Sequence, residues 1–353
     1  MLAGCGAELP EQAKVDRVPT HEPDQPVFEG ELWQYVPAGG VDWVLMGKPR
    51  TLASNPELRT KLEPLLPASR LELYAKNTGL DLRNLPSALV AGFDLGTLYL
   101  AETDTDLTPA TRAFSERLVN TPKLRQSHPR LQRVSGVVGQ TPQALLRFDG
   151  KLLAVAVGDT TTVRIVEAFA LGRLERTARV LDGAALRSFR EFGQDAPLLL
   201  LAPGPFEGKW MYGVQGLLAA ATGVGIAATP IGGAFVDVVV AIDGPWQNET
   251  NPPEAVARMR RAWEELSTSS TGQLFGLHEP AESPSLGSQG DRVELKVRLR
   301  LLPIIDGLRA AVAADVWEML DLKASQELHG TDPQADDRAR DTNGEFGPPL
   351  TKL

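Results

Sequence analysis

Cysteine is almost absent from this sequence. Cys5 is the only one among 353 residues, which excludes an intramolecular disulfide and a cluster of thiolate metal ligands. A lone cysteine acts as a nucleophile only beside a base and on a rigid element. Cys5 is instead followed by the polar, proline-containing stretch GAELPEQ, so its role must be a different one.

Histidine and excess positive charge are scarce as well. The chain has 36 basic and 45 acidic residues, a net charge of -9, and only 4 histidines, which lie far apart without the spacing of a metal site. A protein that binds nucleic acid needs a basic surface to displace counterions from the phosphates. The sequence therefore predicts no nucleic-acid partner, no metal and no cofactor.

Local motifs of catalysis and of membrane crossing are missing too. The stretch APGPFEGKW at 202–210 is similar to a phosphate loop, but only three residues separate Gly204 from Gly208, where that loop requires four. We find no Gly-x-Ser-x-Gly elbow. No apolar run reaches the roughly 18 residues that a transmembrane helix requires.

The chain does contain one specific motif, Leu2-Ala3-Gly4-Cys5. It resembles the lipobox of bacterial lipoproteins. The resemblance implies that Leu2 occupies the hydrophobic site of the signal peptidase and that the two small residues allow its close approach. It also implies that Cys5 is the lipid attachment site and becomes the acylated N-terminus. Two or three acyl chains on one residue hold a protein stably on a membrane.

This resemblance implies a place in the cell and a partner. A lipoprotein carries a signal sequence, so we expect an apolar leader with Lys or Arg ahead of Met1. The residue after the cysteine is Gly6 rather than Asp, which by analogy indicates a palmitate-bearing outer-membrane lipoprotein facing the periplasm or the surface. The alternative is a cytoplasmic protein whose first residues match by chance.

The composition divides the chain into two tails and two modules. Residues 1–28 are rich in proline and charge, and are predicted to be a leader and flexible tether. Residues 328–353 are polar and are predicted to be a disordered tail. Between them we expect an α+β module at 29–175 and a second α+β module at 176–327.

Alternating strand and helix patterns predict an α+β fold. We expect mainly antiparallel sheets with helices on one face, arranged as two similar strand–helix–strand halves. Asn55 and Pro56 form a helix start, with Asn55 as the cap. The stretch GVQGLLAAATGVGIAATPIGG is expected to be a core helix followed by a loop.

One predicted strand, DRVELKVRLRL, carries the candidate binding residues. Alternate residues share one face of a strand, so the apolar positions face the core and the opposite face carries a cationic stripe. The candidate anion- or partner-binding residues of this stripe are Arg292, Lys296, Arg298 and Arg300. An anionic glycan, a lipid headgroup or an envelope protein would suit them. The alternative is a half-exposed strand whose charges keep it soluble.

Trp246 is a second candidate contact. It follows Asp243-Gly244-Pro245 at a predicted loop tip, where an aromatic ring can stack on a sugar. The alternative is that the indole seals the edge of a core, which is the more frequent role.

Two functional hypotheses follow. The first is a lipid-anchored bacterial envelope protein with a non-enzymatic binding or scaffolding role and an unknown ligand. The second is a soluble enzyme, such as a hydrolase, whose site is assembled from scattered acids and histidines. It would require a pocket lined by two coupled carboxylates or by a His–acid pair. The absence of a local catalytic motif favours the first.

Overall fold

The computed structural model describes residues 31–148, 150–174, 193, 195–246 and 252–312. The chain forms two compact units, the first from residues 1–41 and 89–183 and the second from residues 42–88 and 184–353. The predicted modules therefore need one correction, because residues 42–88 belong with the C-terminal half of the chain. The predicted tether, the polar tail and Cys5 lie outside the described residues.

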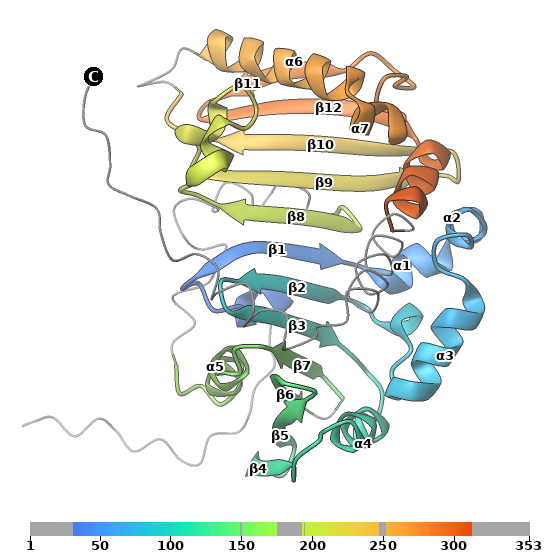
Figure 1. The fold of residues 1–353 in the computed structure, drawn as a ribbon, viewed down its shortest axis with the longest axis vertical. Coiled ribbons are helices and arrows are strands. Elements are labelled where there is room, and N and C mark those ends of the chain that lie inside the picture. Colours follow the sequence, from blue (N-terminus) through green and yellow to red (C-terminus); the bar gives the residue numbers. More distant parts are fainter. Residues whose placement is uncertain (1–30, 149, 175–192, 194, 247–251, 313–353) are drawn as a thin grey trace, which may run out of the picture. The chain divides into compact units, whose positions relative to one another are not determined.

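The first unit is built around six strands in the order β2-β3-β7-β6-β5-β4. Its strands are β2 (Ala88–Phe93), β3 (Gly96–Glu102), β4 (Lys123–His128), β5 (Leu131–Val138), β6 (Thr141–Phe148) and β7 (Leu152–Val157). Its helices are η1 (Leu32–Tyr35), α4 (Thr108–Glu116) and α5 (Thr161–Ala170). The strand pairs from β3 to β4 are antiparallel (Figure 1).

The second unit also contains six strands, in the order β1-β8-β9-β10-β12-β11, and its pairs are antiparallel. The strands are β1 (Val41–Gly47), β8 (Leu198–Pro203), β9 (Gly223–Ile231), β10 (Phe235–Asp243), β11 (Ser285–Gln289) and β12 (Arg292–Arg300). The longer helices are α1 (Pro49–Ser54), α2 (Pro56–Leu62), α3 (Ala68–Thr78), α6 (Pro252–Thr268) and α7 (Ser270–Leu274). Short 3-10 helices are η2 (Leu82–Asn84), η4 (Gly208–Tyr212) and η5 (Leu217–Ala219), and a helix covers 301–312.

The predicted α+β class with antiparallel sheets is confirmed. In each unit a strand leads through a helix to a later strand that pairs with it: β3 and α4 lead to β7, and β10 and α6 lead to β12. In the second unit α6 covers the apolar face of β12. In the first unit the helices lie on both faces of the sheet. Arg147 of β6 donates a hydrogen bond to Thr108 of α4, and Arg133 of β5 forms an ion pair with Glu167 of α5. These two arginines are at adjacent register positions, so their side chains point to opposite faces.

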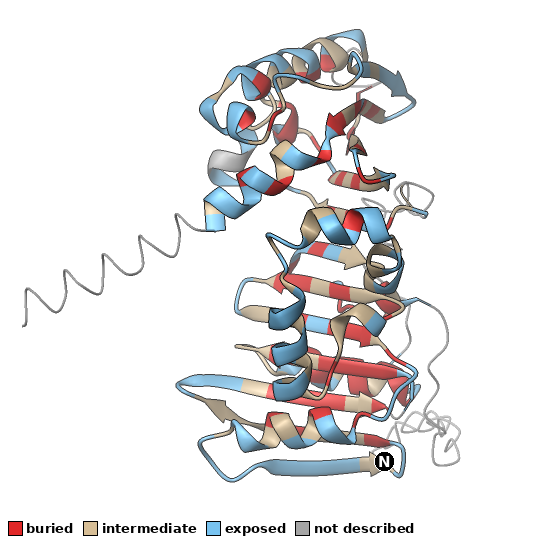
Figure 2. Cartoon of the chain, turned by 90° about the vertical axis from the view of Figure 1, so that its right-hand side faces the viewer, coloured by how far each residue is buried: buried red, intermediate tan, exposed pale blue. Residues whose placement is uncertain are grey.

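The first unit has its core along β6 and β7. Consecutive residues of both strands are buried, among them Leu145, Leu146, Leu152 and Leu153. Consecutive side chains of a strand point to opposite faces, so both faces of these strands are covered. By contrast, β4 at the lower edge in Figure 2 is mostly exposed.

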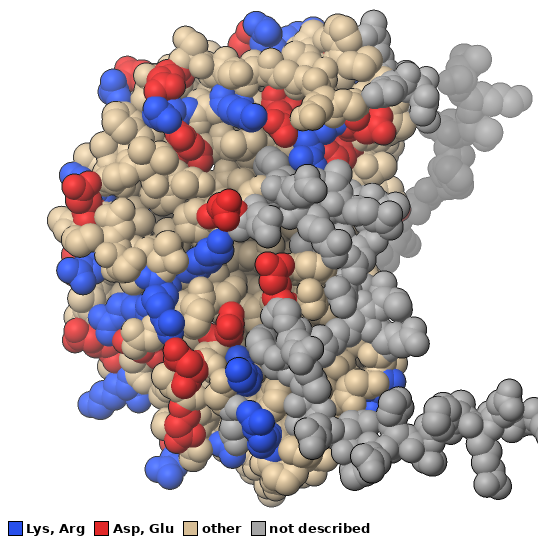
Figure 3. Space-filling model, turned by 180° about the vertical axis from the view of Figure 1, so that it is seen from behind, with Lys and Arg blue, Asp and Glu red and all other residues tan. Residues whose placement is uncertain are grey.

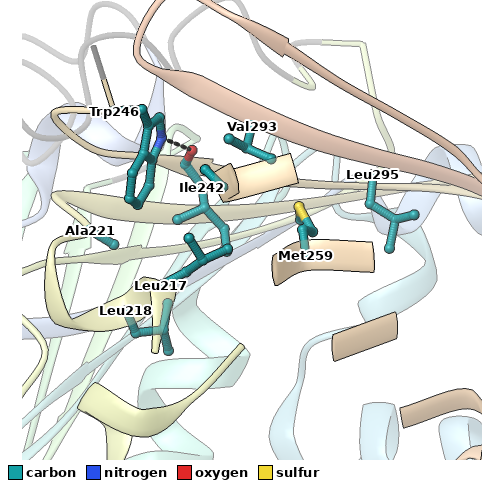
Figure 4. Close-up of a cluster of buried hydrophobic side chains, with 9 residues drawn as sticks. Leu217, Leu218, Ala221, Ile242, Trp246, Met259, Val293 and Leu295 are labelled. Carbon is teal, nitrogen blue, oxygen red and sulfur yellow. Dashed lines mark hydrogen bonds between the residues drawn. The ribbon is translucent and has the colours of Figure 1, made fainter. Parts of the chain in front are cut away.

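The core of the second unit surrounds Trp246 (Figure 4). Its side chain is 1% exposed, and the indole Nε1 donates a hydrogen bond to the Ile242 carbonyl oxygen at 3.3 Å. Met259 of α6 and Leu295 of β12 pack in the same cluster. Trp246 therefore seals a core, and its ring is not available to stack on a sugar.

Two local predictions have clear outcomes. Asn55 caps α2 as expected, because its side-chain oxygen accepts a hydrogen bond from Leu58 N at 3.1 Å. The expected core helix and loop around 213–233 is wrong. Only η5 is helical there, and Gly223–Ile231 form strand β9. Pairing with β8 on one side and β10 on the other outweighs the weak strand preference of glycine and alanine.

Helices long and apolar enough to cross a membrane are not found in the part of the chain that the structure describes.

Candidate anion-binding site

A cavity in the first unit gathers arginines. Its volume is about 310 Å³, and α5, the residues after it, β4 and β5 form its walls. Its charged lining residues are Arg125, Arg133, Arg164, Arg173 and Glu167. We call this cavity the arginine pocket. The described lining thus has four guanidinium groups and one carboxylate, in a chain whose net charge is -9, and one of the four, Arg173, has a further interaction of its own.

Over the face that Figure 3 shows, acidic and basic side chains are interspersed. Interspersed charges keep the local field small, whereas a cleft lined by one sign attracts ligands of the other.

Helix α5 positions two of the charged residues. Arg164 and Glu167 are three residues apart, so they lie next to each other on the helix surface. The neighbouring side of α5 carries Val163 and Val166, which are buried, and the helix contacts β6 and β7. This apolar side fixes the rotation of the helix, so Arg164 and Glu167 are directed to the pocket.

The hairpin of β4 and β5 positions two more. Arg125 and Arg133 are direct partners in the register of this antiparallel pair. Like charges directly opposite each other destabilise a sheet. An anion placed between these guanidinium groups would remove that cost.

Glu167 supplies part of the needed negative charge. Its Oε2 lies 3.0 Å from Arg133 Nε, and its Oε1 lies 3.9 Å from Arg125 Nε. Ser127 Oγ also donates a hydrogen bond to Oε1. The Glu167 side chain is only 8% exposed and that of Arg133 is 13% exposed, so water screens this ion pair weakly.

Arg133 remains incompletely satisfied. Although its Nε is close to Glu167, the N–H does not point at the carboxylate, and this buried nitrogen has no hydrogen-bond partner among the described residues. Burial lowers the pKa of Arg133, Glu167 raises it, and repulsion by Arg125 and Arg164 lowers it further. Charge and hydrogen-bonding capacity are therefore available for a ligand.

The chemistry of these groups favours binding over catalysis. Guanidinium stays protonated at physiological pH and donates only, and its fork matches the oxygens of a carboxylate or a phosphate. A single carboxylate that is engaged with Arg133 and Ser127 is poorly placed to act as a general base.

The four cations predicted on β12 have a different environment. Arg292 Nε lies 2.9 Å from Asp243 Oδ1, and Arg298 Nε lies 2.6 Å from Asp237 Oδ1. Both acids are on β10, directly opposite these arginines. We call this face, with Glu294, Lys296 and Arg300, the charged strip.

The remaining cations of the charged strip also have acidic partners. Lys296 Nζ lies 3.1 Å from Glu294 Oε2, and Arg300 Nη1 lies 3.6 Å from Glu279 Oε2. Arg298 pairs with Glu282 in addition to Asp237. The strip therefore carries both signs of charge, and its role in binding an anion or a partner stays a prediction.

The two aspartates of the charged strip have opposite pKa shifts. The hydrogen bond from Arg298 lowers the pKa of Asp237 and also raises the pKa of Arg298. Burial raises the pKa of Asp243, although Arg292 opposes this shift. Asp243 is thus buried deeply enough that even a paired guanidinium does not fully compensate its charge.

A second cavity, of about 750 Å³, lies within the second unit. Glu57, Lys61 and Arg300 are its charged lining residues, and Glu57 Oε2 accepts a hydrogen bond from Gly233 N at 2.8 Å. Among the lining residues that the structure describes, each of the two cavities has one carboxylate and no histidine. The carboxylate pair or His–acid pair of the enzyme hypothesis is therefore not found in these described linings.

The arginine pocket escaped the sequence reasoning because its register depends on a β-bulge. Pro129 and Arg130 form the turn between KLRQSH and LQRVSGVV, and a regular hairpin about this turn would place Arg125 opposite Val134. A bulge between Gln126 and His128 shifts the register, so that Arg125 lies opposite Arg133. The position of α5 over this hairpin is a tertiary feature, and no local pattern indicated it.

Comparisons with known proteins are sparse. No protein-family model matches the chain, and no curated protein matches it. Among solved structures, crystal forms III and IV of TP0453 are similar, with TM-scores of 0.46 and 0.44 and identities of 7% and 8%. Each match covers 80% of this chain and 99% of the other. A likeness of this extent does not carry a function from one protein to another.

Proposed function

We propose that this protein is a non-enzymatic binding protein of the bacterial cell envelope, whose arginine pocket binds an anionic ligand and which is anchored by lipid on Cys5. One observation carries the binding role: Arg125 and Arg133 are directly opposite each other, and Glu167 is the one carboxylate among the lining residues that the structure describes. Like charges at paired strand positions destabilise the sheet, and an anion that binds between them would stabilise the folded state.

The size of the pocket supports a small ligand. Ligand sites typically have volumes of about 300–1,000 Å³, and the arginine pocket is at the lower end with about 310 Å³. A small anion, or one charged group of a larger molecule, fits this space.

Calorimetric titration with inorganic phosphate tests the binding role. Sodium phosphate is titrated into the full chain at constant ionic strength, with sodium chloride as the reference. We expect saturable binding that Arg125→Gln weakens about tenfold, since a hydrogen bond to a charged group contributes about 1.5–3 kcal/mol.

Arg309→Gln is the matched control for Arg125→Gln. The side chains of Arg309 and Arg125 are 58% and 60% exposed, and Arg309 lies in the helix at 301–312 and lines neither cavity. We expect Arg309→Gln to leave phosphate binding unchanged. Equal losses in both variants, or no saturable binding by the natural chain, would contradict the proposed site.

The proposed lipid anchor has support of a different kind. Leu2-Ala3-Gly4-Cys5 matches the lipobox pattern, and the polar stretch that follows has the composition of a flexible spacer. Expression with the native upstream region and labelled palmitate should label the natural chain in the outer-membrane fraction. Cys5→Ser should lose the label. An unlabelled natural chain in the cytosol would overturn the anchor and favour the cytoplasmic alternative.

A further inference from the structure

The charge of the arginine pocket constrains what it binds. Arg173 has an interaction of its own and is left out of the balance. Among the other described lining residues, subtracting the carboxylate of Glu167 from the guanidinium groups of Arg125, Arg133 and Arg164 leaves two positive charges. A carboxylate ligand contributes one negative charge, whereas a phosphate monoester contributes close to two near pH 7, because its second pKa is about 6. In a partly buried site, uncompensated charge is costly, so the dianion is the better match.

Much of the remaining lining is apolar, which does not suit a bare ion. Ile165, Ala168, Leu171 and Leu174 form an apolar wall beside the guanidinium groups. A water molecule takes about 30 Å³ in the liquid, so the 310 Å³ of the pocket exceeds the space that a phosphate ion fills. The apolar wall would contact a carbon substituent on that phosphate.

We infer that the ligand of the arginine pocket is a phosphate monoester with a small apolar substituent. The phosphate oxygens would accept hydrogen bonds from Arg125, Arg133 and Arg164, and the substituent would lie against Ile165 and Leu174. This inference rests on the proposed anion-binding function and adds the chemical class of the anion.

Four soluble probes test the class. Phenyl phosphate is a monoester dianion with an apolar ring, methyl phenyl phosphate is the matching diester monoanion, benzoate is the matching carboxylate, and inorganic phosphate has no ring. Each is titrated calorimetrically into the full-length Cys5→Ser chain. We expect phenyl phosphate to bind about tenfold more tightly than inorganic phosphate, because burying apolar carbon adds to the affinity. The diester and benzoate should bind more weakly than phenyl phosphate.

Two further readouts separate specific binding from general attraction. The affinity for phenyl phosphate should rise from about pH 5 to about pH 7, as the second proton leaves the phosphate, whereas the affinity for benzoate should not rise. Leu174→Ser should reduce the advantage of phenyl phosphate over inorganic phosphate. Leu274→Ser, at a residue of the second unit with the same 45% exposure, should preserve it.

The outcomes distinguish this inference from the function on which it rests. If inorganic phosphate binds but phenyl phosphate is no tighter, or if benzoate binds as tightly as phenyl phosphate, the monoester inference is overturned and the anion site stands. If none of the probes binds, both are overturned.

A monoester phosphate occurs in soluble metabolites and in lipid headgroups. Phosphatidylcholine vesicles containing phosphatidic acid present the monoester on a lipid, and vesicles containing phosphatidylglycerol present a diester. With phenyl phosphate binding established, retention of the Cys5→Ser chain on the phosphatidic acid vesicles alone assigns the monoester to a headgroup. Absence of retention assigns it to a soluble ester. Equal retention on both kinds of vesicle contradicts monoester recognition.

Discussion

Two antiparallel strand pairs place arginine in opposite electrostatic surroundings. In the second unit, the β10–β12 register sets Arg292 opposite Asp243 and Arg298 opposite Asp237. In the first unit, the β4–β5 register sets Arg125 opposite Arg133. Opposite charges across a strand pair stabilise it and like charges destabilise it. Each cation of the charged strip therefore has an acidic partner on its strand pair or on the segment before β11, whereas two arginines face each other in the arginine pocket.

The source of the compensating charge differs as well. The acids of the charged strip come from β10, from β12 itself and from the segment before β11. The arginine pocket depends on Glu167 of α5. The cations of the charged strip thus have acidic partners of their own, whereas the described residues of the arginine pocket leave positive charge that the proposed anion would compensate.

The largest expected effect comes from replacing Glu167. Glu167→Gln keeps the shape of the side chain but leaves Arg133 without its charge partner in a buried position. Breaking a buried pair in this way costs about 3 kcal/mol of unfolding free energy. Urea unfolding in a chloride buffer should show this loss, and added phosphate should restore part of it, because an anion that binds the folded state stabilises it.

Asp243→Asn provides the control for phosphate rescue. Phosphate raises the stability of many proteins without binding to a site, and this general effect should appear equally in both variants. Only Glu167→Gln should gain more from phosphate than the natural chain does. An equal gain in Asp243→Asn would remove the distinction between the two surfaces.

The two aspartates of the charged strip should respond to pH with opposite signs. The pKa of Asp237 is lowered from 3.8, so the stability that its pairing contributes is present above pH 3.8 and is lost as the pH falls through the lowered pKa. The pKa of Asp243 is raised from 3.8, so in the folded state this carboxyl stays protonated to a higher pH than in the unfolded state. Its contribution to stability therefore decreases as the pH rises from 3.8 through the raised pKa.

Urea unfolding over a pH series tests these signs. The cost of Asp237→Asn relative to the natural chain should grow with rising pH, and the cost of Asp243→Asn should shrink. Parallel pH dependence in the two variants would show that burial does not dominate at Asp243.

A smaller effect is expected at Arg298. Arg298→Gln removes its pairing with both Asp237 and Glu282, so thermal unfolding should occur at a lower temperature. The side chain is 35% exposed, and water screens exposed pairs, so the shift should be smaller than that of Glu167→Gln. Lys296→Gln, which removes a more exposed pairing with Glu294, should change the temperature least. A larger shift for Lys296→Gln would contradict this order.

Part of the structure of the charged strip could be predicted from the sequence. The alternation of DRVELKVRLRL predicted correctly that Val293, Leu295, Val297 and Leu299 are buried. It also placed Arg292 and Arg298 on the same face. Asp237 and Asp243 have the same separation in sequence as those two arginines, so an antiparallel pairing of the two strands would have matched both pairs at once. The charged strip was therefore accessible to a pattern argument that included the partner strand.

The remainder depended on contacts that no local pattern specifies. Strand β9 mixes glycine, alanine and proline with β-branched residues, so its local preference is ambiguous and its pairing on both sides determines its state. Glu167 reaches the β4–β5 hairpin only because α5 packs across the sheet. Residues 42–88 belong to the second unit, and strand alternation does not show in which unit a segment packs.

The smallest expected effect has the most informative sign. Without an anion, Arg125→Gln removes one of two like charges that face each other across β4 and β5. It also removes the 3.9 Å contact with Glu167, but the Arg125 side chain is 60% exposed and water screens this contact, so the unfolding free energy should rise by at most about 0.5 kcal/mol. Arg300→Gln, which removes a pairing with Glu279, should lower the free energy or leave it unchanged. In saturating phosphate the natural chain should become more stable than Arg125→Gln, because that variant binds the anion more weakly. Urea unfolding in chloride and in phosphate measures this reversal. If Arg125→Gln were destabilising in chloride as well, Arg125 would serve the fold rather than a ligand.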